Sequence, residues 1–255
     1  MIYLTGDTHG DFRRVGAFCD IQNTCTDDVL IILGDAGLNY HKPASAAAVK
    51  EQVAELPITL LCIHGNHEAR PQTIPSYHEA QWRGGTVLVE DDYSNILFAI
   101  DGEVFDLDGK QALVIGGAYS VDKEYRLLHG WNWFADEQPS EEIKQRVEQR
   151  LTLLGNRVDV VLTHTCPYRY EPREMFLAMI DQATVDASTE KWLDTIESQL
   201  DYDAWFCGHW HTEKNIDKLH FLFNSFCMLP SGQSALDPAQ DDAFPHNTRL
   251  RGSDE

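Results

Sequence analysis

Five short apolar segments of this chain are each followed closely by Asp, Asn or His, and this repeated pattern limits the folds that the chain can adopt. The segments are residues 2–5, 29–33, 58–63, 158–163 and 204–207. Short apolar runs of this kind are typical of strands buried on both faces of a sheet. Helix-like segments separate the first three runs, so the order is strand, helix, strand, helix, strand. This order predicts a parallel sheet with helices on its faces, the α/β class.

The segments between and after these runs have the pattern of helices. Apolar side chains recur at helical spacing in residues 11–20, 44–56 and 189–200. Another helix is predicted to begin at Pro139 and Ser140, because these residue types favour helix starts, and to end near Gly155.

The middle of the chain has a different pattern, with short strand-like runs separated by Asp, Gly and Asn. These runs are residues 86–90, 96–100, 103–107 and 111–115. Asp108 and Gly109 form a dipeptide typical of tight hairpins, so antiparallel sheet is predicted here. Residues 219–223 and 225–229 are predicted to close a second sheet. We expect one domain over residues 1–230 and a polar tail over residues 231–255.

Composition and charge argue against several classes of protein. Hydrophobic residues make up 43% and charged residues 24%, as in ordinary globular proteins. No apolar run approaches the roughly 20 residues that span a bilayer. The N-terminal residues lack the features of a signal peptide and the six cysteines form no C-x-x-C pair, which predicts a cytoplasmic location and free thiols. The net charge of −21 disfavours nucleic acid as a partner, because a phosphate backbone is bound through Lys and Arg.

The polar residues that follow the apolar runs carry the chemistry. They are Asp7, His9, Asp35, Asn66, His67, His164, His209 and His211. In an α/β sheet the carboxyl ends of the strands open into the crevice where ligands bind, so these side chains are predicted to gather at one edge. Asp7 and His9 are two residues apart, which puts both on one side of an extended chain.

Carboxylate, amide carbonyl and imidazole groups all donate lone pairs to metal ions. Without His67, this set holds two Asp, one Asn and four His, which exceeds the ligands of one tetrahedral zinc ion. It suits two ions about 3.5–4 Å apart that share a carboxylate. A mixed set without thiolate points to Mn, Fe, Zn or Co. The alternative is that these are turn residues and satisfied polar groups, but their recurrence at five strand ends argues against it.

Four motifs and one separate His resemble those of the calcineurin-like metallophosphoesterase superfamily, in the same order. They are Asp7-Thr8-His9, Gly34-Asp35, Gly65-Asn66-His67-Glu68, His164 and Gly208-His209-Trp210-His211. The resemblance implies an α/β fold built as a four-layer α/β/β/α sandwich with two mixed sheets.

The same resemblance implies a role for each residue. It places Asp7, His9 and His211 around one metal ion. It places Asn66, His164 and His209 around a second, with Asp35 bridging both. His67 is then the general acid and not a ligand.

The second motif departs from that of the protein phosphatases in this superfamily, which reads Gly-Asp-x-x-Asp-Arg-Gly. Leu38 and Asn39 stand in place of the Asp that supports the catalytic His and the Arg that binds phosphate. Other arginines are candidates for substrate binding, or are solvated surface residues: Arg126 and Arg70 first, then Arg169 and Arg173. The aromatic-rich residues 116–138 either wall the cleft or pack into the core.

These features together predict an enzyme that hydrolyses phosphate mono- or diesters. Two divalent metal ions are expected, with Mn²⁺ favoured and Fe, Zn or Co as alternatives. A hydroxide that bridges them would attack phosphorus, while His67 protonates the leaving group. The expected substrate is a phosphorylated small molecule or a phosphoprotein. Two alternatives stay open: a non-catalytic, metal-stabilised scaffold or binding module, and a mononuclear zinc hydrolase.

Overall fold

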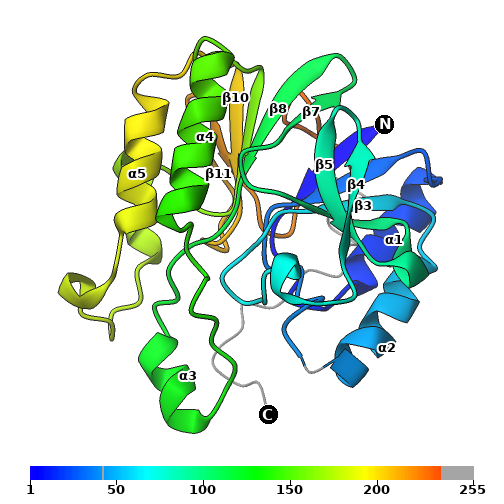
Figure 1. Cartoon of the computed structure of the whole chain (residues 1–255), viewed down its shortest axis with the longest axis horizontal. Coiled ribbons are helices and arrows are strands. Elements are labelled where there is room, and N and C mark those ends of the chain that lie inside the picture. Colours follow the sequence, from blue (N-terminus) through cyan, green and yellow to red (C-terminus); the bar gives the residue numbers. More distant parts are fainter. Residues whose placement is uncertain (42, 237–255) are drawn as a thin grey trace.

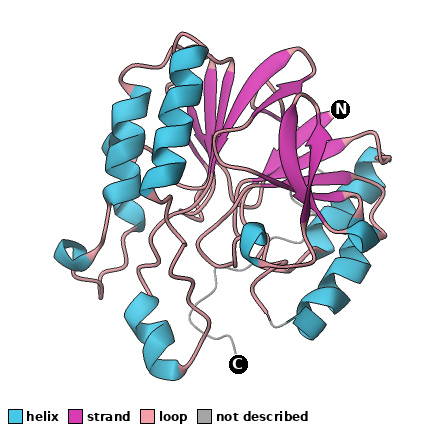
Figure 2. Cartoon of the chain, viewed as in Figure 1, coloured by secondary structure: helices cyan, strands magenta, loops and turns pink. Residues whose placement is uncertain are grey.

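The computed structural model of the chain describes residues 1–41 and 43–236. Two mixed β-sheets pack face to face, and helices cover the outer face of each sheet (Figures 1 and 2). The predicted four-layer α/β/β/α sandwich with two mixed sheets is therefore confirmed. Among the described residues, no helix is both long enough and apolar enough to cross a membrane.

The first sheet has eight strands, four of which are parallel neighbours at its centre. Its order is β14 (Gln233–Ser234), β13 (Cys227–Met228), β1 (Ile2–Thr5), β2 (Val29–Ile32), β3 (Thr59–Cys62), β6 (Ile96–Ala99), β5 (Gly85–Val89) and β4 (His78–Trp82). In the register of the central strands, Thr5 lies opposite Ile32, and Ile32 lies opposite Cys62. The carboxyl ends of β1, β2 and β3 therefore lie at the same level.

The second sheet has six strands and is also parallel at its centre. Its order is β11 (Lys214–Ile216), β12 (Leu219–Phe221), β10 (Ala204–Cys207), β9 (Val160–Thr163), β8 (Lys110–Ile115) and β7 (Val104–Leu107). Cys207 at the end of β10 lies opposite Thr163 at the end of β9. Two strand ends of the second sheet are thus aligned in the same way.

Four helices form the outer layers. As Figure 1 shows, α1 (Arg13–Gln22) and α2 (Pro43–Ala54) cover the first sheet, and α4 (Glu141–Leu153) and α5 (Ser188–Glu197) cover the second. A fifth helix, α3 (Lys123–His129), lies outside these layers, at the bottom of the view in Figure 1. Short 3-10 helices occur in the connections Pro71–Thr73, Asp91–Tyr93, Tyr168–Tyr170, Arg173–Met175 and Gln182–Thr184.

Alternation of side chains along the strands separates the apolar interior into three layers. In β1, Leu4 faces the core between the two sheets, whereas Tyr3 packs against Phe18 of α1. In β10, Phe206 faces the core between the sheets, and Trp205 faces the α4 and α5 side. Both faces of these strands are buried, which explains their continuous apolar sequence.

The structure corrects several predictions of secondary structure. The middle segment is not one antiparallel sheet, because β5 and β6 belong to the first sheet and β7 and β8 to the second. β6 also pairs in parallel with β3. Its residues are buried on both faces, so its periodicity held no information about its partner. The two strands near the C-terminal end also separate: β12 joins the second sheet, whereas β13 pairs with β1.

Other predictions of local structure have mixed outcomes. β4 and α3 were not predicted. The start of the expected tail forms β14, and residues 237–255 of that tail lie outside the described part of the chain. All six cysteines are free thiols, as predicted, and all except Cys25 are buried.

Candidate metal centre

The candidate metal centre lies where the carboxyl ends of both sheets meet. Asp7 follows β1, Asp35 follows β2 and Asn66 follows β3. From the second sheet, His164 follows β9, while His209 and His211 follow β10. Because the strand ends are aligned within each sheet, the chain reaches the same region five times. The structure brings all seven predicted ligand residues together there.

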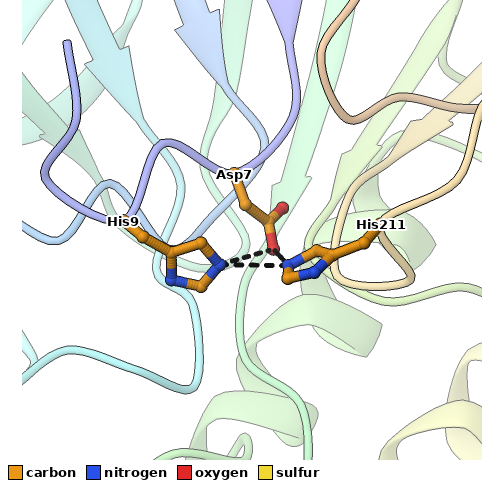
Figure 3. Close-up of side chains that lie close together, drawn as sticks. All are labelled: Asp7, His9 and His211. Carbon is orange, nitrogen blue, oxygen red and sulfur yellow. Dashed lines mark hydrogen bonds and ion pairs between the residues drawn. The ribbon is translucent and has the colours of Figure 1, made fainter. Parts of the chain in front are cut away.

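The first group of ligands is Asp7, His9 and His211, shown in Figure 3. The Nε2 atoms of His9 and His211 are 3.0 Å apart. Oδ2 of Asp7 lies 3.1 Å from Nε2 of His211 and 3.7 Å from Nε2 of His9. Three lone-pair donors therefore converge from two loops that are about 200 residues apart in sequence, as the close-up shows.

The second group is formed by Asn66, His164 and His209. Oδ1 of Asn66 lies 2.8 Å from Nε2 of His164 and 3.1 Å from Nδ1 of His209. Asp35 lies between the two groups, since its Oδ1 is 3.7 Å from Nε2 of His164 and its Oδ2 is 4.0 Å from Nδ1 of His9. This central position is what a bridging ligand requires.

Several ligand residues have a backbone conformation that non-glycine residues rarely adopt. The φ angle is 48° at His9, 47° at Asp35, 64° at His209 and 47° at His211. Backbone strain of this kind costs roughly 1–3 kcal/mol per residue and is concentrated at functional sites. Asp7 and His9 therefore meet because the chain turns at His9, and the prediction of an extended chain here was wrong.

Glycines beside the ligands allow this close packing. A Cβ atom at Gly65 would overlap Oδ1 of Asp35, and a Cβ atom at Gly208 would overlap Oδ1 of Asp7. Only glycine fits at these two positions, because the carboxylates of neighbouring loops lie against the backbone.

Backbone groups fix the orientation of the ligand side chains. The backbone N–H of His209 donates to Oδ1 of Asp7 over 2.9 Å, and that of His67 donates to Oδ1 of Asp35 over 2.8 Å. Nδ1 of His164 lies 2.8 Å from the carbonyl oxygen of Leu33. Since a carbonyl only accepts, Nδ1 of His164 carries the proton, and the Nε2 lone pair faces the other ligands.

Protonation states in the cluster suit metal binding. Burial lowers the pKa of His9 to about 4. Burial and the neighbouring His164 lower the pKa of His209 to about 3. Burial opposes the ionisation of Asp7 and Asp35, but the neighbouring histidines outweigh it and hold the pKa of both carboxyls below the ordinary value. Neutral imidazoles and ionised carboxylates are the forms that ligate metals. The donor set therefore fits divalent cations.

His67 lies beside the cluster, between two carboxylates. Its Nδ1 is 3.9 Å from Oδ2 of Asp35, and its Nε2 is 3.8 Å from Oδ1 of Asp122. Burial opposes protonation, but Asp35 and Asp122 together raise the pKa of His67 above the ordinary value. Nη2 of Arg126 lies 3.1 Å from Nδ1 of His67.

Two buried residues of the 116–138 segment support Asn66. Nδ2 of Asn66 donates to Oγ of Ser120 over 2.9 Å, and Ser120 in turn donates to Oε2 of Glu137 over 2.6 Å. Because the Ser120 hydroxyl proton is given to Glu137, its oxygen accepts from the amide nitrogen. The amide oxygen of Asn66 is thereby turned towards the histidines.

Arg126 is the candidate arginine that reaches the cluster. Arg70 is buried elsewhere, where it forms a 2.6 Å ion pair with Asp101 and donates to the carbonyl of Asp136. Arg169 pairs with Asp194 and Glu197, and Arg173 is exposed. Sequence analysis did not identify Asp122, Ser120 or Glu137. Their only signal was membership of the aromatic-rich segment.

Comparison with known proteins identifies the class. A family model described as calcineurin-like phosphoesterase matches residues 1–213, and the chain belongs to this family of metal-dependent phosphoesterases.

Solved structures share the fold. The protein TT1561 of Thermus thermophilus is 14% identical, with a TM-score of 0.51 over 91% of this chain and 95% of that one. A second solved structure is 13% identical, with a TM-score of 0.50 over 92% of this chain and 97% of that one. No curated protein matches the chain.

Proposed function

We propose that the protein hydrolyses phosphate mono- or diesters at a centre for two divalent metal ions. One observation carries the proposal: seven ligand side chains converge from five loops, with His67 and Arg126 beside them. Asp7, His9 and His211 would hold one ion, and Asn66, His164 and His209 the other. Asp35, which lies between these groups, would contact both.

When bound by these residues, metal ions would supply charge and an activated water. Bound divalent cations lower the pKa of water and neutralise charge on phosphoryl oxygens. Mn²⁺ is the first choice for the mixed N and O donor set, and Fe, Zn and Co are alternatives.

His67 and Arg126 act on the substrate. His67 donates a proton to the ester oxygen as the P–O bond breaks, and the bond electrons stay with that oxygen, so an alcohol leaves instead of an alkoxide. The attacking water forms the new P–O bond, and its proton passes to the solvent. Arg126 binds a phosphoryl oxygen, because its guanidinium is always charged and lies next to His67.

The proposed substrate is a phosphorylated small molecule or a phosphoprotein in the cytoplasm. Nucleic acid is not proposed as a substrate, because the net charge of −21 repels a polyanionic backbone. In addition to the metal ions, Arg126 offers a local cation to the substrate's phosphate group.

The test is hydrolysis of p-nitrophenyl phosphate and bis-p-nitrophenyl phosphate by metal-stripped protein, to which Mn²⁺, Fe²⁺, Zn²⁺, Co²⁺ or Mg²⁺ is returned. Metal content is measured on the same samples by mass spectrometry. We expect two ions per chain and metal-dependent release of p-nitrophenol, and the preferred ester distinguishes a monoesterase from a diesterase.

The two alternatives predict other results. Two bound ions without release from either ester would favour a scaffold or binding module. Activity with one zinc ion per chain would favour a mononuclear hydrolase. A matched control is Asp92→Asn, which removes an exposed carboxylate outside the cluster and leaves metal content and activity unchanged.

A further inference from the structure

Asp122 occupies the N-cap position of α3 but does not act as a helix cap. Asp is a favoured N-cap residue because its carboxylate accepts from the free N–H groups of the first turn. Here the side chain makes no such hydrogen bond. Its two oxygens point to His67 and Arg126 instead.

The two carboxylate oxygens of Asp122 serve different partners. Oδ2 accepts from Nε of Arg126 over 2.8 Å, and Oδ1 lies 3.8 Å from Nε2 of His67. Asp122 thus lies next to Nε2 of His67, the ring nitrogen opposite Nδ1, and binds Nε of Arg126. Nδ1 of His67 is left on the side of Asp35.

Arg126 is held at several other points. Nη1 donates to the hydroxyl of Tyr40 over 3.0 Å and to the carbonyl of Asn132 over 3.3 Å. With Nε committed to Asp122, only Nη2 is directed to His67, at 3.1 Å from Nδ1. The side chain is buried, so this direction is fixed by its partners and not by solvent.

We propose that Asp122 is a positioning residue that holds His67 and Arg126 at once, so that Nδ1 of His67 and Nη2 of Arg126 face the phosphoryl group together. This inference rests on the proposed phosphoesterase activity. In the structure Nη2 of Arg126 donates to Nδ1 of His67 over 3.1 Å. Once Nδ1 carries a proton, both atoms are donors and suit neighbouring oxygens of one phosphate ester, the ester oxygen for His67 and a non-bridging oxygen for Arg126. Asp122 keeps its own charge throughout and exchanges no proton.

The variant Asp122→Asn distinguishes this positioning role from a purely structural one, because the two roles predict a different dependence of kcat on the leaving group. Phenyl phosphate needs a proton on its leaving oxygen, whereas 2,4-dinitrophenyl phosphate does not. Misplacing His67 therefore lowers kcat for the phenyl ester by about 10²-fold, within the range of general acid catalysis, and for the dinitrophenyl ester only severalfold. A general loss of structure would lower both equally.

A second measurement follows Arg126 without turnover. Inorganic phosphate binding to the metal-loaded protein, measured by calorimetry, is expected to weaken about tenfold in Asp122→Asn, because the variant loses a charge-assisted contact that fixes the guanidinium. Tyr40→Phe removes a single hydrogen bond to Nη1 of Arg126. This variant weakens phosphate binding but leaves the leaving-group dependence unchanged.

Controls connect these effects to the proposed contacts. Glu124→Gln changes an exposed carboxylate of α3 and is expected to alter neither measurement. In a His67→Ala background, Asp122→Asn should cause only the severalfold loss on phenyl phosphate that acts through Arg126, since the larger loss acts through His67, which is gone. This double-mutant comparison also works if the single variant is less stable.

Several results would overturn the role of Asp122. Equal losses on both esters, unchanged phosphate binding, or a full additional loss in the His67→Ala background would each exclude it. Failure of the proposed function is a separate outcome, because in that case the wild-type protein hydrolyses neither ester.

Discussion

The seven candidate ligand residues and the 116–138 segment meet at the same site but are held in place by different means. The ligands follow strands whose ends are aligned by backbone pairing, and glycines such as Gly65 and Gly208 let neighbouring loops pack against them. The 116–138 segment leaves the layers after β8 and returns at α4. It contacts the site through side-chain hydrogen bonds of Ser120 and Arg126 and through the ion pair of Asp122 with His67.

This difference separates two tasks. Strand pairing places the ligands with little freedom, which is what a metal centre needs. Hydrogen bonds from the segment position the groups that we propose act on the substrate. Changes in the ligand cluster should therefore abolish metal binding and activity together, whereas changes around the segment should affect them separately.

The largest effect is expected for Asp35→Asn. Asp35 lies between both ligand groups, so its loss weakens both metal sites. Charge stabilisation by metal ions contributes several kcal/mol to the transition state, and each step of about 1.4 kcal/mol is tenfold in rate. We expect kcat for p-nitrophenyl phosphate to fall by roughly 10³–10⁴-fold, with metal content below two ions per chain. Full metal content with wild-type kcat would show that Asp35 is not part of the centre.

His67→Ala is expected to have the next largest effect and to separate metal binding from action on the substrate. His67 comes from the loop after β3 but contacts Asp122 and Arg126 of the segment. General acid catalysis contributes about 10²–10⁴-fold, so kcat for phenyl phosphate should fall by roughly 10³-fold while two metal ions remain bound. The matched control is His78→Ala, an exposed residue of β4. Loss of metal from His67→Ala would make His67 a ligand.

The comparison also explains which parts of the molecule could be predicted from sequence. Buried parallel strands have a continuous apolar pattern, and residue types that can bind metals stand out after them, so Asp7, Asp35 and His164 could be predicted as candidate ligands from local sequence. The contacts of Asp122 and Ser120 depend on where residues 116–138 fold back, and no periodicity specifies that path. Arg70 and Arg126 looked alike in sequence, and their partners in the structure, Asp101 and His67, distinguish them.

One buried carboxyl lies near the candidate ligand His164 and another lies in the 116–138 segment, and the two should differ in their effect on stability. Glu190 of α5 accepts from Thr165, next to His164, but its Oε2 has no partner. Burial raises its pKa to about 7. Glu137 in the segment accepts from Ser120 and Trp133, and burial raises its pKa as well. Because Glu137 has more hydrogen-bond donors, Glu190 is the carboxyl with the uncompensated cost of ionisation.

The sign of the Glu190 effect follows from its raised pKa. The folded protein favours the neutral acid, so the stabilisation is complete below the unfolded value of about 4.5 and is lost as the pH rises to about 7. Relative to Glu190→Gln, the wild-type free energy of unfolding should fall by roughly 3 kcal/mol between about pH 4.5 and 7.5. Urea unfolding of metal-free protein measures it, with the exposed Glu141→Gln as control. An unchanged difference between wild type and variant over this range would place the Glu190 pKa near its ordinary value.

The smallest effect is expected for Ser120→Ala, which tests whether the segment also acts on the ligands. Without the Ser120 hydroxyl, the amide of Asn66 loses the acceptor that turns its oxygen to His164 and His209. Loss of such supporting contacts typically costs about 10–100-fold in metal affinity. We expect about tenfold, because Ser120 orients one ligand of seven, and chelator competition measures the change against the exposed Ser94→Ala. Unchanged metal affinity with reduced turnover would show that the segment acts on the substrate and not on the metal ligands. The two tasks would then be divided completely between the two regions.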